Sequence, residues 1–178
     1  MLLSAKIVSV FDGLTKPERV RTLILDDSVI TRSRSKKVEL LAKVYDHVDH
    51  LYKKGFTLLT LGWSDGYSFL PVGFNMLSSA KKSNRYQEIS ANIDHRTNGY
   101  KNRRQALAKK SEAAVTLVKK ALVQEPNNLA YIDTLAWGQY KLKNCKEANK
   151  QMKRVVDEIG LNDEEIKLHW EKIKECKK

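Results

Sequence analysis

The chain has 178 residues, of which 42% are apolar and 30% charged, and its formal net charge is +12. This length excludes a large multidomain enzyme, because domains commonly have roughly 100 to 200 residues. No stretch approaches the roughly 20 uncharged apolar residues of a membrane span, so we expect a cytoplasmic protein that does not bind membranes. The two cysteines, Cys145 and Cys176, form no CxxC pair and argue against a disulfide scaffold or a zinc knuckle.

The positive charge is concentrated in the first two thirds of the chain. Residues 1–112 contain 20 Lys and Arg against 11 Asp and Glu, whereas residues 113–178 contain 13 against 10. The densest block is 81–110, where nine basic side chains face only Glu88 and Asp94. A basic excess of this kind attracts polyanions such as nucleic acid. A solvated helix face is the alternative interpretation.

Hydrophobic periodicity predicts the first elements. Residues 4–14 have helical spacing, and residues 20–29 are typical of a buried strand, which ends at the acidic pair of the LILDDS motif. A polar basic loop follows. The segment VELLAKVYDHVDHLYKKG, residues 38–55, places its apolar residues on one helical stripe and predicts a helix capped by Gly55.

A hairpin and a series of helices are expected next. The runs FTLLTLGW and YSFLPVGFNML predict two antiparallel strands around a turn at Asp65 and Gly66. Later residues are helical, with breaks at 125–128, 143–144 and 160–163. Because no Gly or Pro lies between Lys101 and Pro126, one continuous helix is expected there.

The LILDDS motif, with Asp26 and Asp27, has a chemical interpretation. A sheet holds an Asp at the end of a buried strand rigidly, as a divalent metal requires. Two-metal phosphoryl transfer needs at least two such carboxylates, so one acidic pair can equally be a strand cap that satisfies the following loop.

The run from ERVRTLILDDS to NRRQAL, within residues 5–112, closely resembles the catalytic region of DDE transposases of bacterial insertion sequences. The resemblance implies a ribonuclease H-like α/β fold, here a partial one of three strands with helices. It also implies Mg²⁺ and metal-dependent DNA strand transfer. Asp27, which Ser28 follows, matches the first catalytic Asp and metal ligand, and Asp26 is the runner-up. Basic residues after this strand would contact DNA phosphates: Arg32, Arg34, Lys36 and Lys37. The basic block adds Arg103 and Arg104.

The chain departs from the transposase pattern after residue 112. The strand with the second Asp is missing there, and the Glu is not identifiable. Asp133 in YIDTLAW is the only residue that looks like a second acid, and its apolar flanks fit another pattern better. We therefore expect a catalytically incomplete transposase core.

The other pattern is that of a tetratricopeptide repeat, which residues 113–178 resemble. Ala114, Val118 and Ala121 occupy second-helix positions, and Ala148, Met152 and Val155 recur 34 residues later, at the period of that repeat. The final segment from Leu161 is expected to be a capping helix. This predicts an all-α helical hairpin with a capping helix, joined to the α/β part at 112/113.

Three functions remain open from the sequence. The first is a transposase remnant with weak, non-specific DNA affinity. The second is an interaction module that binds a protein partner through the repeat helices. The third is an active nuclease that recruits Asp133 or Glu147 as a missing ligand. His47 and His50 have no third ligand in view and are expected to be surface residues.

Overall fold

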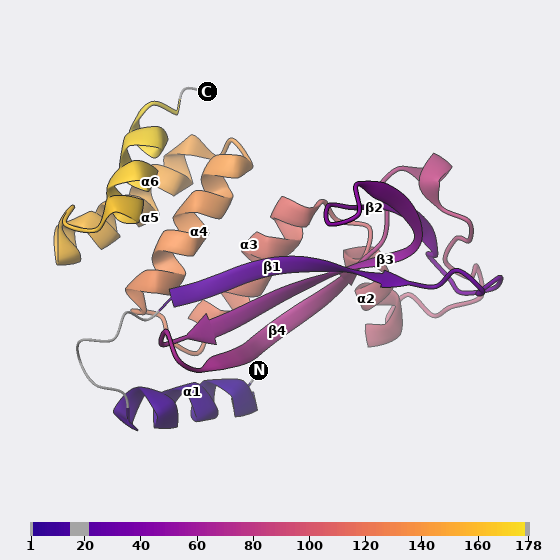
Figure 1. Cartoon of the computed structure of the whole chain (residues 1–178), viewed down its shortest axis with the longest axis horizontal. Coiled ribbons are helices and arrows are strands. Elements are labelled where there is room, and N and C mark those ends of the chain that lie inside the picture. Colours follow the sequence, from indigo (N-terminus) through magenta and orange to yellow (C-terminus); the bar gives the residue numbers. More distant parts are fainter. Residues whose placement is uncertain (1, 15–21, 177–178) are drawn as a thin grey trace. The chain divides into compact units, whose positions relative to one another are not determined.

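A computed structural model describes residues 2–14 and 22–176. The described residues begin with helix α1 (Leu2–Leu14), followed by four strands that form one antiparallel sheet. The strands are β1 (Thr22–Thr31), β2 (Ala42–Asp46), β3 (Leu51–Ser64) and β4 (Phe69–Leu77). Strand β3 lies between β1 and β2 and also pairs with β4 (Figure 1). The expected α/β class is confirmed, but the described sheet has four strands and not the three that were expected.

Helices make up most of the remaining described chain. A 3₁₀ turn, η1 (Lys82–Asn84), precedes helix α2 (Asn98–Gln105). Four further helices follow: α3 (Lys110–Leu122), α4 (Leu129–Lys141), α5 (Cys145–Ile159) and α6 (Glu164–Lys174). Within the described ranges, no helix is long and apolar enough to cross a membrane.

Two compact units divide the chain. One, here the helical unit, comprises residues 1–24, 61–73 and 114–178. The other, here the basic unit, comprises residues 25–60 and 74–113.

The predicted helix over residues 38–55 is wrong, because this segment forms the β2–β3 hairpin. Buried and exposed residues alternate along β2, and its register with β3 runs from Ala42 opposite Gly55 to Asp46 opposite Leu51. The Asp46 carboxylate accepts hydrogen bonds from the backbone N–H of Val48 at 2.9 Å and of Asp49 at 3.4 Å. This local turn competes with a helix. Four of the six residues of the supposed apolar stripe are therefore exposed: Tyr45, Val48, Leu51 and Tyr52.

Gly55 is consequently a strand residue and not a helix cap. A Cβ at Gly55 would lie 2.1 Å from the backbone oxygen of Ile30 in β1, so only glycine allows the two strands to approach this closely.

Strand β1 differs from its prediction in burial and length. Its first two expected residues, 20 and 21, lie outside the described residues, and the strand continues to Thr31. Leu25 is 38% exposed, so β1 is not a fully buried strand. The acidic pair lies in the middle of the strand and not at its end.

The predicted β3–β4 hairpin is confirmed. The carboxylate of Asp65 accepts hydrogen bonds from the N–H groups of Tyr67 at 3.1 Å and Ser68 at 2.6 Å. Gly66 has φ +87°, a conformation that favours glycine. Local turn chemistry therefore determines this hairpin.

The expected continuous helix from Lys101 to Pro126 is wrong, because residues 106–109 separate α2 from α3. The carbonyl of Ala106 accepts a hydrogen bond from the N–H of Ser78 at 2.7 Å. In a continuous helix that carbonyl would accept from the N–H of Lys110. Ala106 and Leu107 also pack against the core of the basic unit, which consists of Leu40, Leu41 and Phe56.

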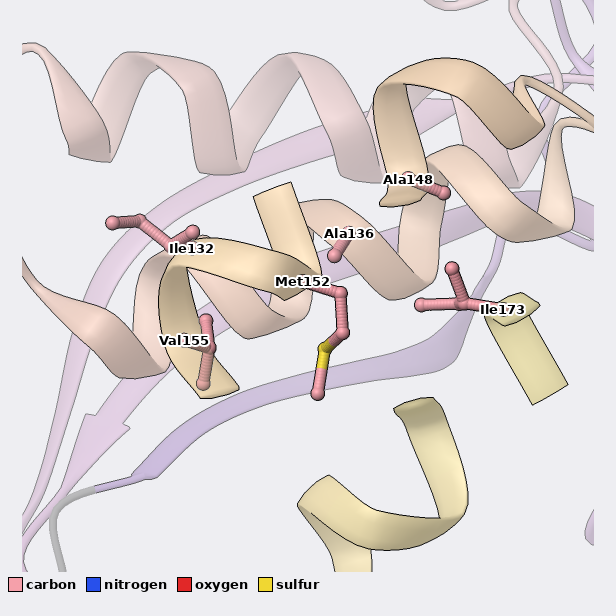
Figure 2. Close-up of a cluster of buried hydrophobic side chains, with 6 residues drawn as sticks. All are labelled: Ile132, Ala136, Ala148, Met152, Val155 and Ile173. Atoms are coloured by element: carbon pink, nitrogen blue, oxygen red, sulfur yellow. The ribbon is translucent and has the colours of Figure 1, made fainter. Parts of the chain in front are cut away.

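The three helix breaks predicted after residue 122 are confirmed. Asn128 caps α4 by accepting from the N–H of Tyr131, and Asp163 caps α6 by accepting from the N–H groups of Glu165 and Ile166. Figure 2 shows the core that these helices enclose, which consists of fully buried side chains: Ile132, Ala136, Ala148, Met152, Val155 and Ile173.

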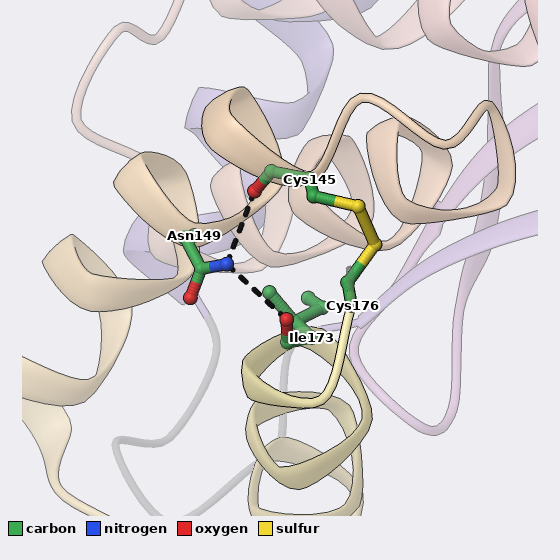
Figure 3. Close-up of a disulfide and its surroundings, with 4 residues drawn as sticks. All are labelled: Cys145, Asn149, Ile173 and Cys176. Atoms are coloured by element: carbon green, nitrogen blue, oxygen red, sulfur yellow. Dashed lines mark hydrogen bonds between the residues drawn. A yellow bond between two sulfur atoms is a disulfide. The ribbon is translucent and has the colours of Figure 1, made fainter. Parts of the chain in front are cut away.

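The two cysteines form a disulfide, although their number and spacing argue against a disulfide scaffold. Cys145 begins α5 and Cys176 follows α6, and their Cα atoms lie 5.5 Å apart. The side-chain amide of Asn149 donates to the carbonyls of Cys145 at 3.1 Å and Ile173 at 3.2 Å, so it joins the same two helix ends (Figure 3). None of these observations tests the cytoplasmic location, which stays a prediction.

Candidate nucleic-acid interface

Asp27, the predicted first catalytic acid, is engaged in an ion pair. The Lys110 ammonium donates to its Oδ2 at 2.8 Å, and the Asp27 side chain is 24% exposed. Asp26 is exposed on the same strand. Successive side chains of a strand point to opposite faces of the sheet, so these two carboxylates cannot both ligate one metal ion from adjacent positions.

Asp133, the predicted second acid, also has a partner of its own. Its carboxylate lies 2.9 Å from Nδ1 of His169, and the imidazole stacks on Trp137 with ring centroids 4.2 Å apart. His169 is buried, with 7% exposure. Asp133 belongs to the helical unit, whereas Asp27 belongs to the basic unit. The contacts of Asp133 therefore indicate a role in packing α4 against α6.

The remaining donors do not form a metal site with Asp27. Among the residues that the structure describes, no group of three or more His, Cys, Asp or Glu could hold a metal ion. Glu147, the other candidate ligand, accepts a hydrogen bond from Gln151 on its own helix. One carboxylate already paired with an ammonium does not fit a Mg²⁺ ion, which prefers several oxygen ligands in octahedral geometry.

Residues 32–37, here called the basic loop, expose all four of the predicted phosphate-binding side chains: Arg32, Arg34, Lys36 and Lys37. The loop backbone is held at several points. The N–H of Arg32 donates to the carbonyl of Lys54 at 2.8 Å, and the side-chain amide of Gln87 donates to the carbonyl of Lys36 at 3.3 Å. These contacts position the backbone of the loop, while the charged groups of its side chains remain in solvent.

Glu39, which follows the basic loop in the chain, contacts helix α2. Its carboxylate forms an ion pair with Nε of Arg103, and its Oε1 accepts from the N–H of Ser90 at 2.9 Å. The hydrogen bond from Arg103 is the main cause that lowers the pKa of Glu39, and the bond from Ser90 contributes next. The two groups of predicted phosphate contacts, which are far apart in the sequence, therefore lie close together.

This pairing separates the roles of two neighbouring arginines. The guanidinium of Arg103 binds Glu39 and also donates to the carbonyl of Gly99 at 3.0 Å, so it positions α2. Arg104 is exposed and has no ion pair among the described residues. Of the two, Arg104 is the one available to a phosphate.

The basic segment after β4 lies beside the same loop. The N–H of Tyr86 donates to the carbonyl of Leu41 at 2.7 Å, and the N–H of Leu40 donates to the carbonyl of Gln87 at 3.1 Å. Lys81 and Lys82 are exposed just before this segment. The basic unit as a whole contains 16 Lys and Arg against 8 Asp and Glu.

The basic side chains can be identified from the sequence, but the residues that hold their segments close together cannot. Glu39, Gln87 and Ser90 carry no motif, and Glu39 is 64 residues from Arg103. An isolated acid within a basic block is the one local signal that could have indicated such a tether.

Comparisons with family models, with curated proteins and with solved structures find no match to this chain.

Proposed function

We propose that this chain is a transposase-derived DNA-binding protein that holds duplex DNA through phosphate contacts and does not carry out strand transfer. In this proposal residues 1–112 derive from a truncated ribonuclease H-like DDE core and residues 113–178 from a tetratricopeptide-like segment. The observation that carries the proposal is the ion pair between Glu39 and Arg103, which gathers the exposed charges of the basic loop and α2.

The charge of the basic unit supports contacts to DNA phosphates. Its exposed cations include Arg32 and Arg34 in the basic loop and Arg104 on α2, and none of these forms an ion pair within the described ranges. Backbone contacts of this kind fix a protein on DNA without reading its sequence. We therefore expect weak binding without sequence preference.

The salt dependence of binding tests the proposal. If about four phosphates are neutralised, log K for a fluorescent duplex should fall with log salt at a slope near −3.6. Replacing Arg32→Gln and Arg34→Gln together should reduce this slope by about 1.8. The matched control is Lys153→Gln with Lys150→Gln, which removes two exposed charges from α5 in the helical unit. Binding that does not depend on salt, or an equal effect of both pairs, would refute the proposal.

The two arginines of α2 give a second test. Arg104→Gln should reduce the slope by about 0.9, because it removes one phosphate contact. Arg103→Gln removes the same charge but breaks the tether to Glu39, so we expect it to weaken binding by loosening the loop and not by removing a contact. An identical slope change for both variants would show that the tether is unimportant.

Metal-dependent cleavage is the test of the catalytic alternative. With Asp27 paired to Lys110, we expect no nicking of duplex DNA in Mg²⁺ or Mn²⁺. Nicking that disappears in Asp27→Ala would establish an active nuclease instead.

A second candidate function is protein binding through the helical unit. The observation that favours it is the burial of all six positions related by the 34-residue period: Ala114, Val118, Ala121, Ala148, Met152 and Val155. Stacked helices with this pattern are typical of repeat proteins that bind partners on an extended surface. This function would be supported if the full chain retains a protein partner and a variant at Leu168, which is exposed on α6, does not retain it.

A further inference from the structure

The outer face of the β2–β3 hairpin carries only cationic and aromatic side chains. In the register of the two strands, Lys43 lies opposite Lys54 and Tyr45 lies opposite Tyr52. Directly opposed residues of an antiparallel pair project on the same face, and alternate residues share that face. Val44 and Asp46 lie on the other face, where they are buried. We call these two lysines and two tyrosines, of which Lys54 is half-buried and the others are exposed, together with Tyr86, the tyrosine-lysine face.

Tyr86 extends this face beyond β2. The residue before it, Arg85, forms a β-bridge with Ala42, and the N–H of Tyr86 donates to the carbonyl of Leu41. The ammonium of Lys54 lies 5.1 Å from the centroid of the Tyr86 ring. The segment 85–86 is therefore a short neighbour of β2, and its tyrosine belongs to the same surface.

The electrostatics of this face indicate an anionic ligand. Like charges directly opposite each other destabilise a strand pair, and Lys43 and Lys54 are such a pair. Lys43 lies 4.7 Å from the Tyr52 ring centroid, and neither lysine has a carboxylate partner among the described residues. The nearby acid Asp46 instead binds Lys53, at 2.8 Å.

The tyrosines of this face are exposed, although a lysine ammonium lies over the ring of Tyr52 and another over the ring of Tyr86. Tyr45 is 37% exposed, Tyr86 53% and Tyr52 60%. Tyr45 contacts the Tyr52 ring edge to face, with centroids 5.2 Å apart, and this contact holds the two rings in a fixed relation.

We propose that the tyrosine-lysine face binds single-stranded DNA, with bases stacked on Tyr52 and Tyr86 and phosphates bound by Lys43 and Lys54. Unpaired bases offer their ring faces to aromatic side chains, whereas the bases of a duplex are stacked on one another. A strand of alternating base and phosphate matches alternating rings and ammonium groups. This inference rests on the proposed DNA binding and deepens it. The basic loop is proposed to bind duplex DNA, whereas the β2–β3 hairpin is proposed to bind single-stranded DNA.

The test compares two single-stranded probes in an anisotropy titration of the full chain at low salt: a fluorescent oligothymidylate and an abasic strand of the same length. The abasic strand has the same phosphates and no bases. Wild type should bind oligothymidylate more tightly. The double variant Tyr52→Leu with Tyr86→Leu removes both stacking rings, so it should bind oligothymidylate at least about thirtyfold more weakly than wild type, close to the affinity for the abasic strand.

Three controls separate stacking from other effects. Phe74→Leu removes an aromatic ring that is 68% exposed on β4 and should change nothing. Tyr52→Phe with Tyr86→Phe keeps both rings and should keep the affinity. Tyr86→Leu alone, outside the hairpin ladder, provides a test if the double variant loses the cooperative melt of the wild type.

The outcomes distinguish this inference from the proposed duplex binding. The tyrosine variants should leave duplex affinity unchanged, whereas Arg32→Gln with Arg34→Gln should weaken duplex binding. Equal affinity of wild type for oligothymidylate and the abasic strand would overturn the stacking site while leaving duplex binding intact. An equal loss of single-strand and duplex affinity in the tyrosine variants would also overturn it.

Discussion

Breaking the Cys145–Cys176 disulfide should substantially destabilise the helical unit. The cysteines are 31 positions apart, and the closed loop contains nearly all of α5 and all of α6. In the loop-entropy description, a cross-link over this separation lowers the conformational entropy of the unfolded chain. This loss raises the free energy of the unfolded state by about 3.7 kcal/mol at room temperature. For a chain of this size, such a loss corresponds to a decrease in melting temperature of about 7 to 15 °C.

The variant Cys176→Ser provides the perturbation with little change in packing, because Cys176 is partly exposed whereas Cys145 is buried. The bonds from Asn149 to both helix ends do not depend on the sulfur atoms, so we expect the reduced protein to remain folded. Thermal melting followed by circular dichroism, with and without reductant, measures the difference.

Reductant should lower the melting temperature of the wild type and have no effect on Cys176→Ser. A thiol assay should find no free thiol in the oxidised wild type after denaturation and two after reduction. Two free thiols in protein purified without reductant, or equal melting of the oxidised and reduced chains, would refute the reasoning.

Three further predictions concern packing and charge. Gly55→Ala should destabilise the protein by about 1 to 3 kcal/mol in urea denaturation, because its Cβ would overlap the carbonyl of Ile30, whereas Gly13→Ala, with open space around it, should not. Met152→Ala should cost about 2 to 5 kcal/mol, because it leaves a cavity in a fully buried cluster, and the exposed neighbour Lys153→Ala should be close to neutral. Arg103 lowers the pKa of Glu39 from its ordinary value of 4.5. The stabilisation of the folded protein by the Glu39–Arg103 ion pair is therefore present above pH 4.5 and is lost as the pH falls through the lowered pKa. Wild type should therefore lose more stability on acidification than Glu39→Gln, and parallel pH profiles of urea midpoints would contradict this.

The sequence by itself determined the elements that local chemistry specifies. The turn at Asp65 and Gly66 and the caps at Asn128 and Asp163 depend on side chains that bond to their own backbone within three residues. Such signals are complete in a short window. The basic residues of the loop were identified in the same way, since surface charge is a property of composition.

Only the tertiary structure decided the features that depend on distant partners. The apolar spacing of residues 38–55 fits a helix, whereas the pairing of β2 with β3 and the close approach of Gly55 to Ile30 of β1 select the strands. Helix α2 does not continue into α3, because the N–H of Ser78 donates to the carbonyl of Ala106. Likewise, the ion pair of Arg103 is made with Glu39, 64 residues away. The turn at Asp46 is a local signal, but the contact of Gly55 with β1, the bond from Ser78 and the ion pair with Glu39 involve distant partners that no local pattern encodes.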